Sequence, residues 1–558
     1  MADQFYTSMA TNAHQPLLDS PRVVTSFSFF FLVSVAAILS STALLATVRL
    51  KKVDTSNSPA SLTGLCDHAD GFQDSCLFLV SEISRNRAPD SDGMKFVELF
   101  LRDSAHRIDD TGKKVKLARL KVNDPREEAV LAVCAELMDL SSGRIMESIR
   151  DLPRVESRDD AHTWLSTVLT NHMTCLEELK GHAKDEFEEE LMDLILRAKT
   201  VLSVFVSVLS SPAKGVQPFP IEEDFPTWLT EEDRKLLETS MKKIKADVVV
   251  AKDGSGNYTT VSDAVAAAPT NSKTRYVIYV KKGKYDEIVR LGSSLKNIML
   301  VGDGMNSTVI TGSLNVINGS TTFNSATVAA VGDGFIAQDI CFQNTAGPEQ
   351  HQAVALRVGA DRSVINRCQI DAYQDTLYAH SNRQFYRDSN ITGTVDFIFG
   401  NAAAVFQNCW LIARKPMSGQ KNMVTAQGRT DPNQNTATSI QNCSIVASAD
   451  LQPVLKNFTS YLGRPWKLYS RTVVMQSYID KLISPAGWSV WDGDFALDTL
   501  YYGEYMNTGP GAKTNKRVNW TGYHIITNAT VAEEFTVAQL IQGDVWLNST
   551  GVNFNPGL

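Results

Sequence analysis

Two aspartates stand at matching places in a pattern that repeats along the second half of the chain. Asp375 lies five residues after Ile370, and Asp396 lies five residues after Ile391. If the repeats stack as neighbouring parallel strands, about 4.8 Å apart, the two carboxyl groups become neighbours on one face. Two adjacent carboxylates cannot both ionise freely, so the pKa of one should rise. The spacing therefore predicts a neutral acid beside an ionised nucleophile, both built from aspartate.

The residues around Asp396 bear on this prediction. The stretch 393–401, Gly-Thr-Val-Asp-Phe-Ile-Phe-Gly-Asn, places apolar and aromatic side chains that would keep water from its carboxylate. Arg464 is a candidate for a bidentate ion pair that would keep Asp396 charged, and Trp466 offers a face for a sugar ring. The alternative is a structural ladder of aspartate turns with a structural arginine, because solenoid turns use aspartate freely. The local pattern leaves both interpretations open.

The repeat also predicts the element that must hold these side chains. From Asp247 onward, short β-branched runs alternate with Gly, Asn and Asp, which is typical of an all-β region. Three positions with spacings of three and two residues recur six times, and the shortest steps between repeats are 20 and 21 residues. Such steps predict a solenoid of stacked β coils; an irregular β-sandwich is the alternative. The six triplets are Ile336/Asp339/Cys341, Ile365/Cys368/Ile370, Tyr386/Ser389/Ile391, Phe406/Cys409/Leu411, Ile440/Cys443/Ile445 and Val474/Ser477/Ile479.

Residues 62–210 have a different character. Gly and Pro are few, and apolar residues recur at helical spacing in the stretch 188–196 and beyond it. This pattern predicts a bundle of four or more helices. Four polar residues before Cys175 match no usual set of metal ligands, so we expect core or surface roles for them and no metal. They are Asp159, Asp160, His162 and His172.

Two polar linkers divide the chain. Residues 53–61 precede the helical region, and residues 211–246, which include four prolines, separate it from residues 247–558. The second linker holds a basic-apolar tetrad that is either an exposed protease site or the start of a short amphipathic helix. The tetrad is Arg234, Lys235, Leu236 and Leu237.

The first 52 residues form a tail that contains an apolar segment. Residues 23–48 carry no charge and are long enough to span a bilayer. A cleaved signal peptide and an uncleaved signal-anchor both fit this segment. Basic residues flank it on both sides, and long domains can translocate despite such charges, so the flanks do not settle the orientation.

Cysteines and glycosylation acceptors favour the secretory route. Eight cysteines, four in each half, fit two disulfides per half. Acceptor sequences for N-glycosylation are frequent, and each alone is a weak signal. They include those at Asn257, Asn306, Asn318, Asn390, Asn457, Asn519, Asn528 and Asn548.

Composition excludes several classes of protein. The 558 residues are 43% hydrophobic and 21% charged, which rules out a wholly disordered or fibrous chain. The net charge is −8, and the residues from Asp247 onward carry 25 basic and 24 acidic side chains, so the acidic excess lies before Asp247. Neither half has the basic excess of a nucleic-acid-binding protein.

The second half resembles the plant pectinesterases (pectin methylesterases) over nearly all of residues 247–558. Residues 62–210 are similar to the inhibitor-like pro-region that many of these enzymes carry, and the tetrad at 234–237 resembles their processing motif. The matching stretches are Gly347–Arg357 (GPEQHQAVALR), Tyr373–Leu377 (YQDTL), Gly393–Ala402 (GTVDFIFGNA), Asn422–Arg429 (NMVTAQGR) and Leu462–Trp466 (LGRPW).

The resemblance implies a right-handed parallel β-helix preceded by an all-α pro-domain. It implies hydrolysis of the methyl ester on the C6 carboxyl of galacturonate in pectin, without a cofactor. Asp396 would be the nucleophile and Asp375 the proton donor and general base. Gln374 and Gln352 would stabilise the oxyanion.

Further implied roles concern binding and covalent structure. Thr322, Gln352, Arg464 and Trp466 would contact the substrate. Partners would be pectin, the chain's own pro-region, separate inhibitor proteins and a processing protease, and the enzyme would act in the cell wall after secretion. The implied disulfides are Cys66–Cys76, Cys134–Cys175, Cys341–Cys368 and Cys409–Cys443.

Two questions stay open at the level of sequence. The pro-region can cap the active site, assist folding or act as a retention signal. The same scaffold can also carry a Ca²⁺-dependent pectate lyase, a polygalacturonase or a non-catalytic wall-binding solenoid, because carboxylate pairs alone do not separate an esterase from a glycosidase. The Gln-Asp-Thr-Leu and Gly-Arg-Pro-Trp contexts favour the esterase through the resemblance.

Overall fold

A computed structural model describes most of the chain from Cys66 onward, and the described residues fall within one compact unit, residues 59–558. The apolar segment 23–48, the linker 53–61 and the tetrad 234–237 lie outside the described residues. Among the helices that are described, none combines the length and apolar character needed to cross a membrane. The described ranges are 66–69, 71–85, 93–180, 187–210 and 245–558.

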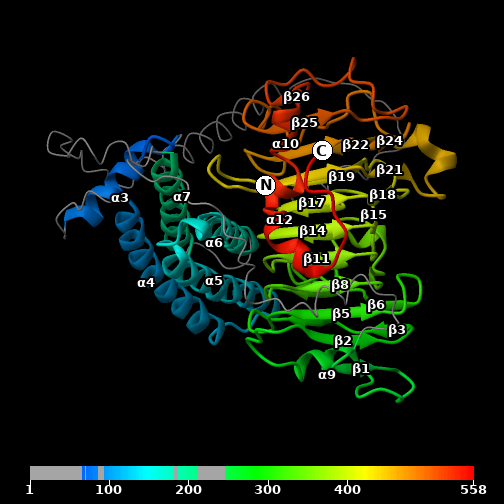
Figure 1. Ribbon diagram of the computed structural model, residues 1–558, viewed down its shortest axis with the longest axis horizontal. Coiled ribbons are helices and arrows are strands. Elements are labelled where there is room, and N and C mark those ends of the chain that lie inside the picture. Colours follow the sequence, from blue (N-terminus) through cyan, green and yellow to red (C-terminus); the bar gives the residue numbers. More distant parts are fainter. Residues whose placement is uncertain (1–65, 70, 86–92, 181–186, 211–244) are drawn as a thin grey trace, which may run out of the picture. The chain divides into compact units, whose positions relative to one another are not determined.

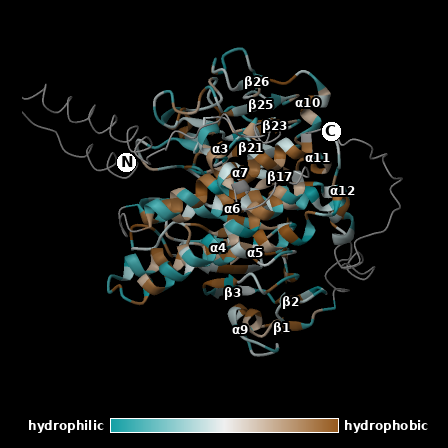
Figure 2. Cartoon of the chain, turned by 90° about the vertical axis from the view of Figure 1, so that its left-hand side faces the viewer, coloured by the Kyte–Doolittle hydropathy of each residue, from teal (hydrophilic) through white to brown (hydrophobic). Residues whose placement is uncertain are grey.

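The front part of the described chain is helical, as predicted. Its helices are α3 (Gln73–Arg85), α4 (Gly93–Arg119), α5 (Pro125–Asp151), α6 (Arg158–Leu179) and α7 (Glu188–Ser210), with a short 3₁₀ turn, η3 (Val155–Ser157), before α6. In Figure 2 these helices carry both brown and teal residues, as expected for amphipathic helices around a shared core.

Local chemistry explains how these helices begin and what ties them together. Asp124 caps α5 by accepting hydrogen bonds from the backbone N–H groups of Arg126 and Glu127, and Pro125 occupies the first turn, where no N–H donor is needed. The predicted disulfide Cys134–Cys175 joins α5 to α6. The predicted disulfide Cys66–Cys76 joins the start of the described chain to α3.

From Asp247 onward the chain winds through three parallel sheets, and every strand pairs with the equivalent strand of a neighbouring coil (Figure 1). This is a parallel β-helix. The eleven-stranded sheet contains β1 (Val248–Val250), β2 (Tyr276–Val280), β5 (Ile298–Gly302), β8 (Ile336–Gln338), β11 (Ser363–Asn366), β14 (Arg383–Arg387), β17 (Ala403–Gln407), β20 (Ala437–Gln441), β23 (Arg471–Met475), β25 (Tyr501–Tyr505) and β26 (Tyr523–Ile525). The seven-stranded sheet contains β4 (Val289–Leu291), β7 (Val328–Ala330), β10 (Leu356–Val358), β13 (Leu377–Ala379), β16 (Ile398–Gly400), β19 (Asn422–Gln427) and β22 (Ser460–Gly463). The eight-stranded sheet contains β3 (Gly283–Asp286), β6 (Thr308–Gly312), β9 (Cys341–Asn344), β12 (Gln369–Asp371), β15 (Asn390–Gly393), β18 (Trp410–Ala413), β21 (Ser444–Ala447) and β24 (Tyr478–Ile479).

Short helices complete this part of the chain. A long apolar core fills the coils, and residues after the last strand pack on the outer face of the eleven-stranded sheet, where Phe535 and Trp546 join its outer cluster. The short helices are α9 (Val261–Ala266), α10 (Ala529–Glu533), α11 (Val537–Ile541) and α12 (Gly543–Trp546), with 3₁₀ turns η5 (Pro348–Gln350), η6 (Gln452–Asn457) and η7 (Leu547–Thr550).

The predicted repeat is correct in five coils and one residue out of register in the first. Ile365 pairs with Tyr386, and the series continues through equivalent positions of β17, β20 and β23. In the first coil, however, Ile365 pairs with Ala337 rather than with Ile336. The inward-facing triplet is therefore Ala337, Ile340 and Phe342, all in the core. Ala337 is small and gives only a weak apolar signal at the inward position. The neighbouring Ile336, which packs on the outer face, gives a stronger apolar signal one residue earlier.

The register bears differently on the two disulfides implied for the β-helix: it separates Cys341 from Cys368, and it aligns Cys409 with Cys443. All four cysteines of this region are buried thiols. Gln369 pairs with Cys341, so Cys368 aligns with Ile340 and points into the core, while Cys341 points to the other face of its strand. Their side chains therefore diverge although their coils are adjacent. Cys409 and Cys443 do align in successive coils, but there the Cys443 sulfur accepts a hydrogen bond from the Cys409 N–H at 3.3 Å.

Candidate active site

The two aspartates occupy the same position in successive coils, as the repeat predicts. Asp375 stands two residues before β13 and Asp396 two residues before β16, and these strands pair Leu377 with Ile398. The Asp375 N–H donates to the Val395 carbonyl at 3.0 Å, which ties one turn to the next. The parallel register therefore brings the two carboxyl groups to one corner of the seven-stranded sheet.

Both aspartates adopt a left-handed backbone. Their φ angles are 62° for Asp375 and 50° for Asp396. A residue other than glycine rarely takes this conformation, although aspartate tolerates it better than most. Such strain persists only where the surrounding structure holds it, and it is found often at functional sites. Here it recurs in adjacent turns and gives both carboxyl groups the same presentation.

Arg464 forms the predicted bidentate ion pair with Asp396. Its Nε and Nη2 donate to the two carboxylate oxygens at 2.9 and 2.7 Å. Asp396 is only 6% exposed, so this contact balances a charge that has little water around it. The guanidinium also lies 4.2 Å from the centre of the Trp491 ring. Arg464 is thus fixed from two sides, and it fixes the carboxylate in turn.

Asp375 has a different electrostatic environment. Burial raises the pKa of its carboxyl group well above the ordinary range, the negative charge of Asp396 raises it further, and Arg464 opposes the change only in part. Asp375 therefore stays protonated at a pH where an ordinary aspartate is charged. The two carboxyl groups therefore have unlike surroundings: Asp396 is paired with a guanidinium, and the pKa of Asp375 is raised.

The two predicted glutamines lie at the same corner. Gln352 and Gln374 pair as an isolated parallel bridge, one coil apart, just before β10 and β13. The Gln374 side-chain oxygen is buried and has no hydrogen-bond partner among the described residues. Both residues therefore belong to the row of turns that leads into the seven-stranded sheet, and Gln374 directly precedes Asp375.

Aromatic side chains form a wall beside the carboxyl groups. Tyr378 stacks on Phe399 with ring centres 4.2 Å apart, and Trp466 meets Phe399 edge-on at 5.8 Å. Phe323 approaches Tyr378 edge-on at 6.4 Å, and the predicted contact Thr322 precedes it in the chain. The structure thus brings Trp466 and the Thr322 loop to opposite ends of one aromatic surface.

Sequence reasoning missed most of this wall. Tyr378 and Phe399 each follow an active-site aspartate by three residues, so the repeat contained a signal for both. Trp491 carries no such signal, because it lies outside the repeated triplets. The 320s loop, residues 320–326, joins the site through long-range contacts that spacing cannot reveal.

Helix α6 of the helical region lies against this wall. Thr174 and the buried His380 are 3.1 Å apart, and the Phe323 N–H donates to the Glu178 carboxyl at 3.3 Å. Glu177 forms an ion pair with Lys467, the residue after Trp466. Phe323, Tyr378 and Phe399 belong to the same hydrophobic cluster as the core of the helices. The wall is therefore covered by α6.

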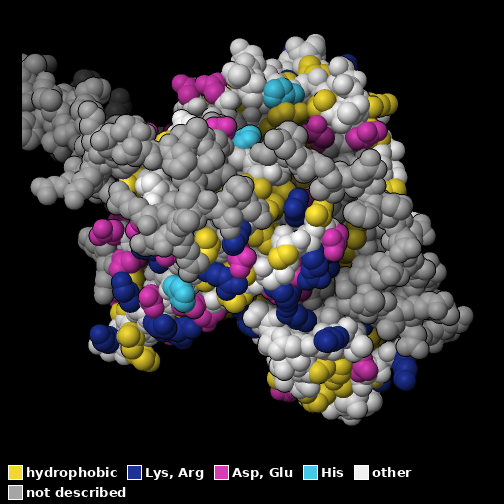
Figure 3. Space-filling model, turned by 60° about the vertical axis from the view of Figure 1, so that its left-hand side comes forward, with side chains coloured by type: hydrophobic (Ala, Val, Ile, Leu, Met, Phe, Trp, Pro, Cys, Tyr) yellow, Lys and Arg dark blue, Asp and Glu magenta, His cyan; other side chains and the backbone are white. Residues whose placement is uncertain are grey.

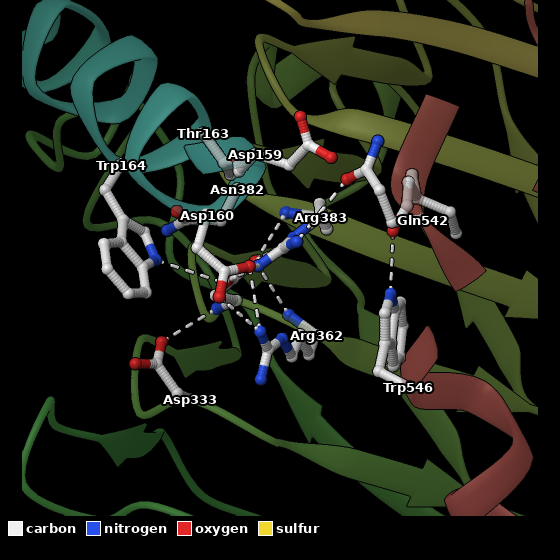
Figure 4. A network of polar contacts seen from close by, with 12 residues as sticks. Asp159, Asp160, Thr163, Trp164, Asp333, Arg362, Asn382, Arg383, Gln542 and Trp546 are labelled. Carbon is white, nitrogen blue, oxygen red and sulfur yellow. Dashed lines mark hydrogen bonds and ion pairs between the residues drawn. The ribbon is translucent and has the colours of Figure 1, made fainter. Parts of the chain in front are cut away.

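A buried polar network joins α6 to the β-helix at one side of this contact (Figure 4). Asp160 pairs with Arg362 at 2.8 Å and with Arg383 at 2.7 Å. The indole N–H of Trp164 donates to Asp361 at 3.2 Å. Asp160 therefore acts as an anchor between the two regions. His162 likewise contacts the Asn433 carbonyl across the two regions, whereas the sequence predicts only a core or surface role for it.

Charge elsewhere on the surface is mixed. On the face shown in Figure 3, basic and acidic side chains are interspersed over the described elements.

The fold and the site together define a β-helical enzyme with paired aspartates, joined to a helical covering region. The family described as "Pectinesterase" matches residues 247–544, and the family "Plant invertase/pectin methylesterase inhibitor" matches residues 60–209. The chain belongs to the pectinesterase family. It is a pectin methylesterase with an inhibitor-like pro-region.

Relatives and solved structures agree with this assignment. The chain is 56% identical over 559 residues to "Pectinesterase/pectinesterase inhibitor 18" of Arabidopsis thaliana, covering 98% of this chain and all of that one. It is 59% identical over 502 residues to "Pectinesterase/pectinesterase inhibitor" of Ficus pumila var. awkeotsang, covering 88% and 91%. The solved structure of pectin methylesterase from carrot is 63% identical, with a TM-score of 0.56, and covers 57% of this chain and all of its own.

Proposed function

We propose that the chain removes methyl groups from pectin through the aspartate pair at the corner of the seven-stranded sheet. The observation that carries this proposal is the difference in environment between two residues at equivalent positions. Asp396 forms a bidentate ion pair with Arg464, while burial raises the pKa of Asp375. A charged nucleophile beside a neutral acid is the pair that ester hydrolysis through a covalent intermediate requires.

The first half of the reaction forms an acyl-enzyme. An Asp396 oxygen attacks the carbonyl carbon of the C6 methyl ester, and the carbonyl oxygen becomes a tetrahedral oxyanion. The amide N–H groups of Gln352 and Gln374 stabilise this charge, each by about 3 kcal/mol at most. The C–O bond to the methoxy group then breaks, Asp375 gives its proton to the departing oxygen, and methanol leaves.

The second half releases the product. Asp375, now ionised, takes a proton from a water molecule that attacks the acyl carbon. The bond to Asp396 breaks, its carboxylate returns to Arg464, and a galacturonate carboxylate remains on the polymer. One ester and one water give one methanol, one carboxylate and one proton. Trp466 and the Thr322 loop hold the sugars along the aromatic wall.

We further propose that the helical region keeps the enzyme silent until the linker is cut. This proposal is supported by contacts of α6 at the aromatic wall: Thr174 with His380, Glu178 with Phe323, and Glu177 with Lys467 beside Trp466. A protease that cuts at residues 234–237 would then separate the regions, and separate inhibitor proteins of the same helical type would bind the exposed wall. Secretion to the cell wall, through the apolar segment 23–48, completes this proposal.

Methanol release from highly methylated pectin tests the reaction. The samples are residues 245–558, the same fragment with Asp396→Ala, and residues 53–558. The carrot chain, which matches 57% of this chain along its whole length, supports independent folding of the short fragment. Methanol without new reducing ends or ultraviolet-absorbing product, lost in the Asp396→Ala fragment, is the expected result.

Other outcomes separate the parts of the proposal. New reducing ends would indicate a glycosidase, and an ultraviolet-absorbing product would indicate a lyase. A folded short fragment that releases no methanol would overturn the catalytic assignment. If residues 53–558 were as active as the short fragment, the silencing role of the helical region would be wrong while the esterase mechanism would stand.

A further inference from the structure

Arg357 lies on the outer surface of the same sheet as the aromatic wall. In the parallel register it pairs with Tyr378 on β13, and Tyr378 pairs with Phe399 on β16. Leu356 and Val358 on either side of it belong to the inner core, so Arg357 points outward. It therefore continues the row of wall residues, one strand from Tyr378 and two strands, about 10 Å, from Phe399.

The guanidinium of Arg357 is held in place but is not saturated with hydrogen bonds. It lies 3.3 Å from the centre of the Phe323 ring, and the side chain is almost completely buried. Its Nη2 is 3.7 Å from the Glu136 carboxylate, while its Nε and Nη1 are buried and have no hydrogen-bond partner among the described residues. Buried N–H groups without partners are costly, so such a site favours an incoming acceptor.

The counterion of Arg357 comes from the helices, because Glu136 on α5 is the acidic group that faces its guanidinium. Glu178 on α6 also lies near Arg357, but burial raises the pKa of its carboxyl group to about 7, so it contributes charge only when ionised. The neighbouring Arg290 on β4 adds a second positive charge and supplies no counterion. Its N–H groups donate hydrogen bonds to the carbonyls of Asn324 and Ala326. Burial and repulsion from Arg357 lower the pKa of Arg290 to about 10. Once the helices leave, Arg357 is a cation without a counterion beside the aromatic wall.

We propose that Arg357 binds a free carboxylate of the polymer, on a galacturonate unit that has already lost its methyl group. Glu136 occupies this site in the uncut chain as a stand-in for that carboxylate. The proposal rests on the esterase function proposed above. The C6 group of each unit is neutral as an ester and negative after hydrolysis, so a fixed guanidinium distinguishes the two forms.

The position of Arg357 gives this preference a direction. The reacting ester lies at Asp396, before β16, and Arg357 is two strands away on β10. A hydrolysed unit bound at Arg357 therefore places a unit further along the same polymer at the aspartates.

Binding and kinetics of residues 245–558 test the proposal. The probes are polygalacturonate, pectin with about half of its esters removed, and fully methylated pectin. For Arg357→Gln, we expect polygalacturonate to bind about tenfold more weakly and KM for the half-hydrolysed pectin to rise about tenfold, with a smaller change for fully methylated pectin. Arg357→Lys, which keeps the charge, should recover part of the loss. Arg367→Gln, in an exposed turn and paired with Asp339, is the control for loss of one positive charge.

The outcomes are distinguishable from failure of the proposed function. A wild-type fragment without methanol release would overturn the esterase assignment, and polygalacturonate binding would still report on Arg357. An active fragment in which Arg357→Gln binds polygalacturonate as tightly as wild type would overturn the carboxylate site. Equal losses on all three probes, or equal losses in Arg357→Lys and Arg357→Gln, would assign Arg357 a structural role instead.

Discussion

Two arginines lie beside the aromatic wall, and they differ in where their counterions come from. Arg464 lies 4.2 Å from the Trp491 ring and Arg357 lies 3.3 Å from the Phe323 ring, so both are held by an aromatic face. Arg464, however, makes two short hydrogen bonds to Asp396 from the same region. The ion pair of Arg357 among the described residues is a longer contact, at 3.7 Å, with Glu136 of the helical region.

The difference separates a positioning residue from a ligand-binding residue. A guanidinium whose counterion is part of the β-helix stays balanced when the helices leave, and it orients that counterion for chemistry. A guanidinium whose counterion leaves with the helices becomes a site for another anion. Under the proposals above, the same side chain on the same kind of aromatic support would position a nucleophile in one place and bind a substrate carboxylate in the other.

The largest loss of activity is expected when the ion pair between Arg464 and Asp396 is broken. Arg464→Gln in residues 245–558 leaves Asp396 buried without its counterion, and breaking such a pair typically costs about 3–5 kcal/mol. We expect kcat for methanol release to fall about 100- to 1,000-fold. Arg464→Lys restores the charge without the bidentate geometry and should recover only part of this loss. If kcat of Arg464→Gln stayed within threefold of wild type, the distinction between the two arginines would fail.

The second prediction concerns the proton on Asp375, whose pKa is raised by burial and by the charge of Asp396. Replacing Asp375 by Asn removes the acid and base at similar shape and should lower kcat about 100-fold or more. In the wild-type enzyme, the step that needs the protonated acid should slow as pH rises past the raised pKa of Asp375. Rates of methanol release from pH 4 to pH 9 measure this limb. A limb that is unchanged in a partly active Asp375→Asn enzyme belongs to another group.

Glu178 tests how firmly α6 covers the Phe323 end of the aromatic wall. Burial raises the pKa of Glu178 to about 7, and the hydrogen bond from the Phe323 N–H opposes this only in part. The covered state therefore favours the protonated acid: its contribution is complete below pH 4.5 and is lost as pH rises through 7. Methanol release by residues 53–558, relative to residues 245–558, should increase about tenfold between pH 5 and pH 8.

Glu178→Gln supplies the matched test of that pH dependence. Glutamine keeps an oxygen that can accept from the Phe323 N–H but cannot ionise, so the variant should stay covered at pH 8. The control is Glu128→Gln, because Glu128 pairs with Arg119 within the helical region. An equal pH response in Glu178→Gln and wild type would show that another group controls the cover.

The sequence predicts the surroundings of Arg464 much better than those of Arg357, and the reason is physical. The coil repeat aligns Asp375 with Asp396 because a step near 20 residues gives one turn of the solenoid, and each coil contributes the same position. Arg464 could be nominated because a buried carboxylate needs a cation. The contact is confirmed, while the catalytic roles remain proposals.

The remaining features depend on contacts between distant parts of the chain. Arg357 occurs in a recognisable stretch, yet its missing hydrogen bonds are visible only when Phe323 and Glu136 are in place. The first coil was misaligned because Ala337 gives a weak apolar signal beside Ile336. Repetition therefore predicts positions along the solenoid, and it carries no information on which helix covers them.

The smallest change in activity is expected when the contact between Glu136 and Arg357 is removed. Glu136 is 40% exposed on its side chain, so its pairing with Arg357 contributes about 0.2–1 kcal/mol. Glu136→Gln in residues 53–558 should therefore raise methanol release by the uncut chain only about two- to threefold, and added polygalacturonate should raise it more in the variant than in wild type. Glu128→Gln again provides the control. If added polygalacturonate acted equally on both chains, the Glu136 carboxylate would not compete with the polymer for Arg357. The two arginines would then differ less than their contacts indicate.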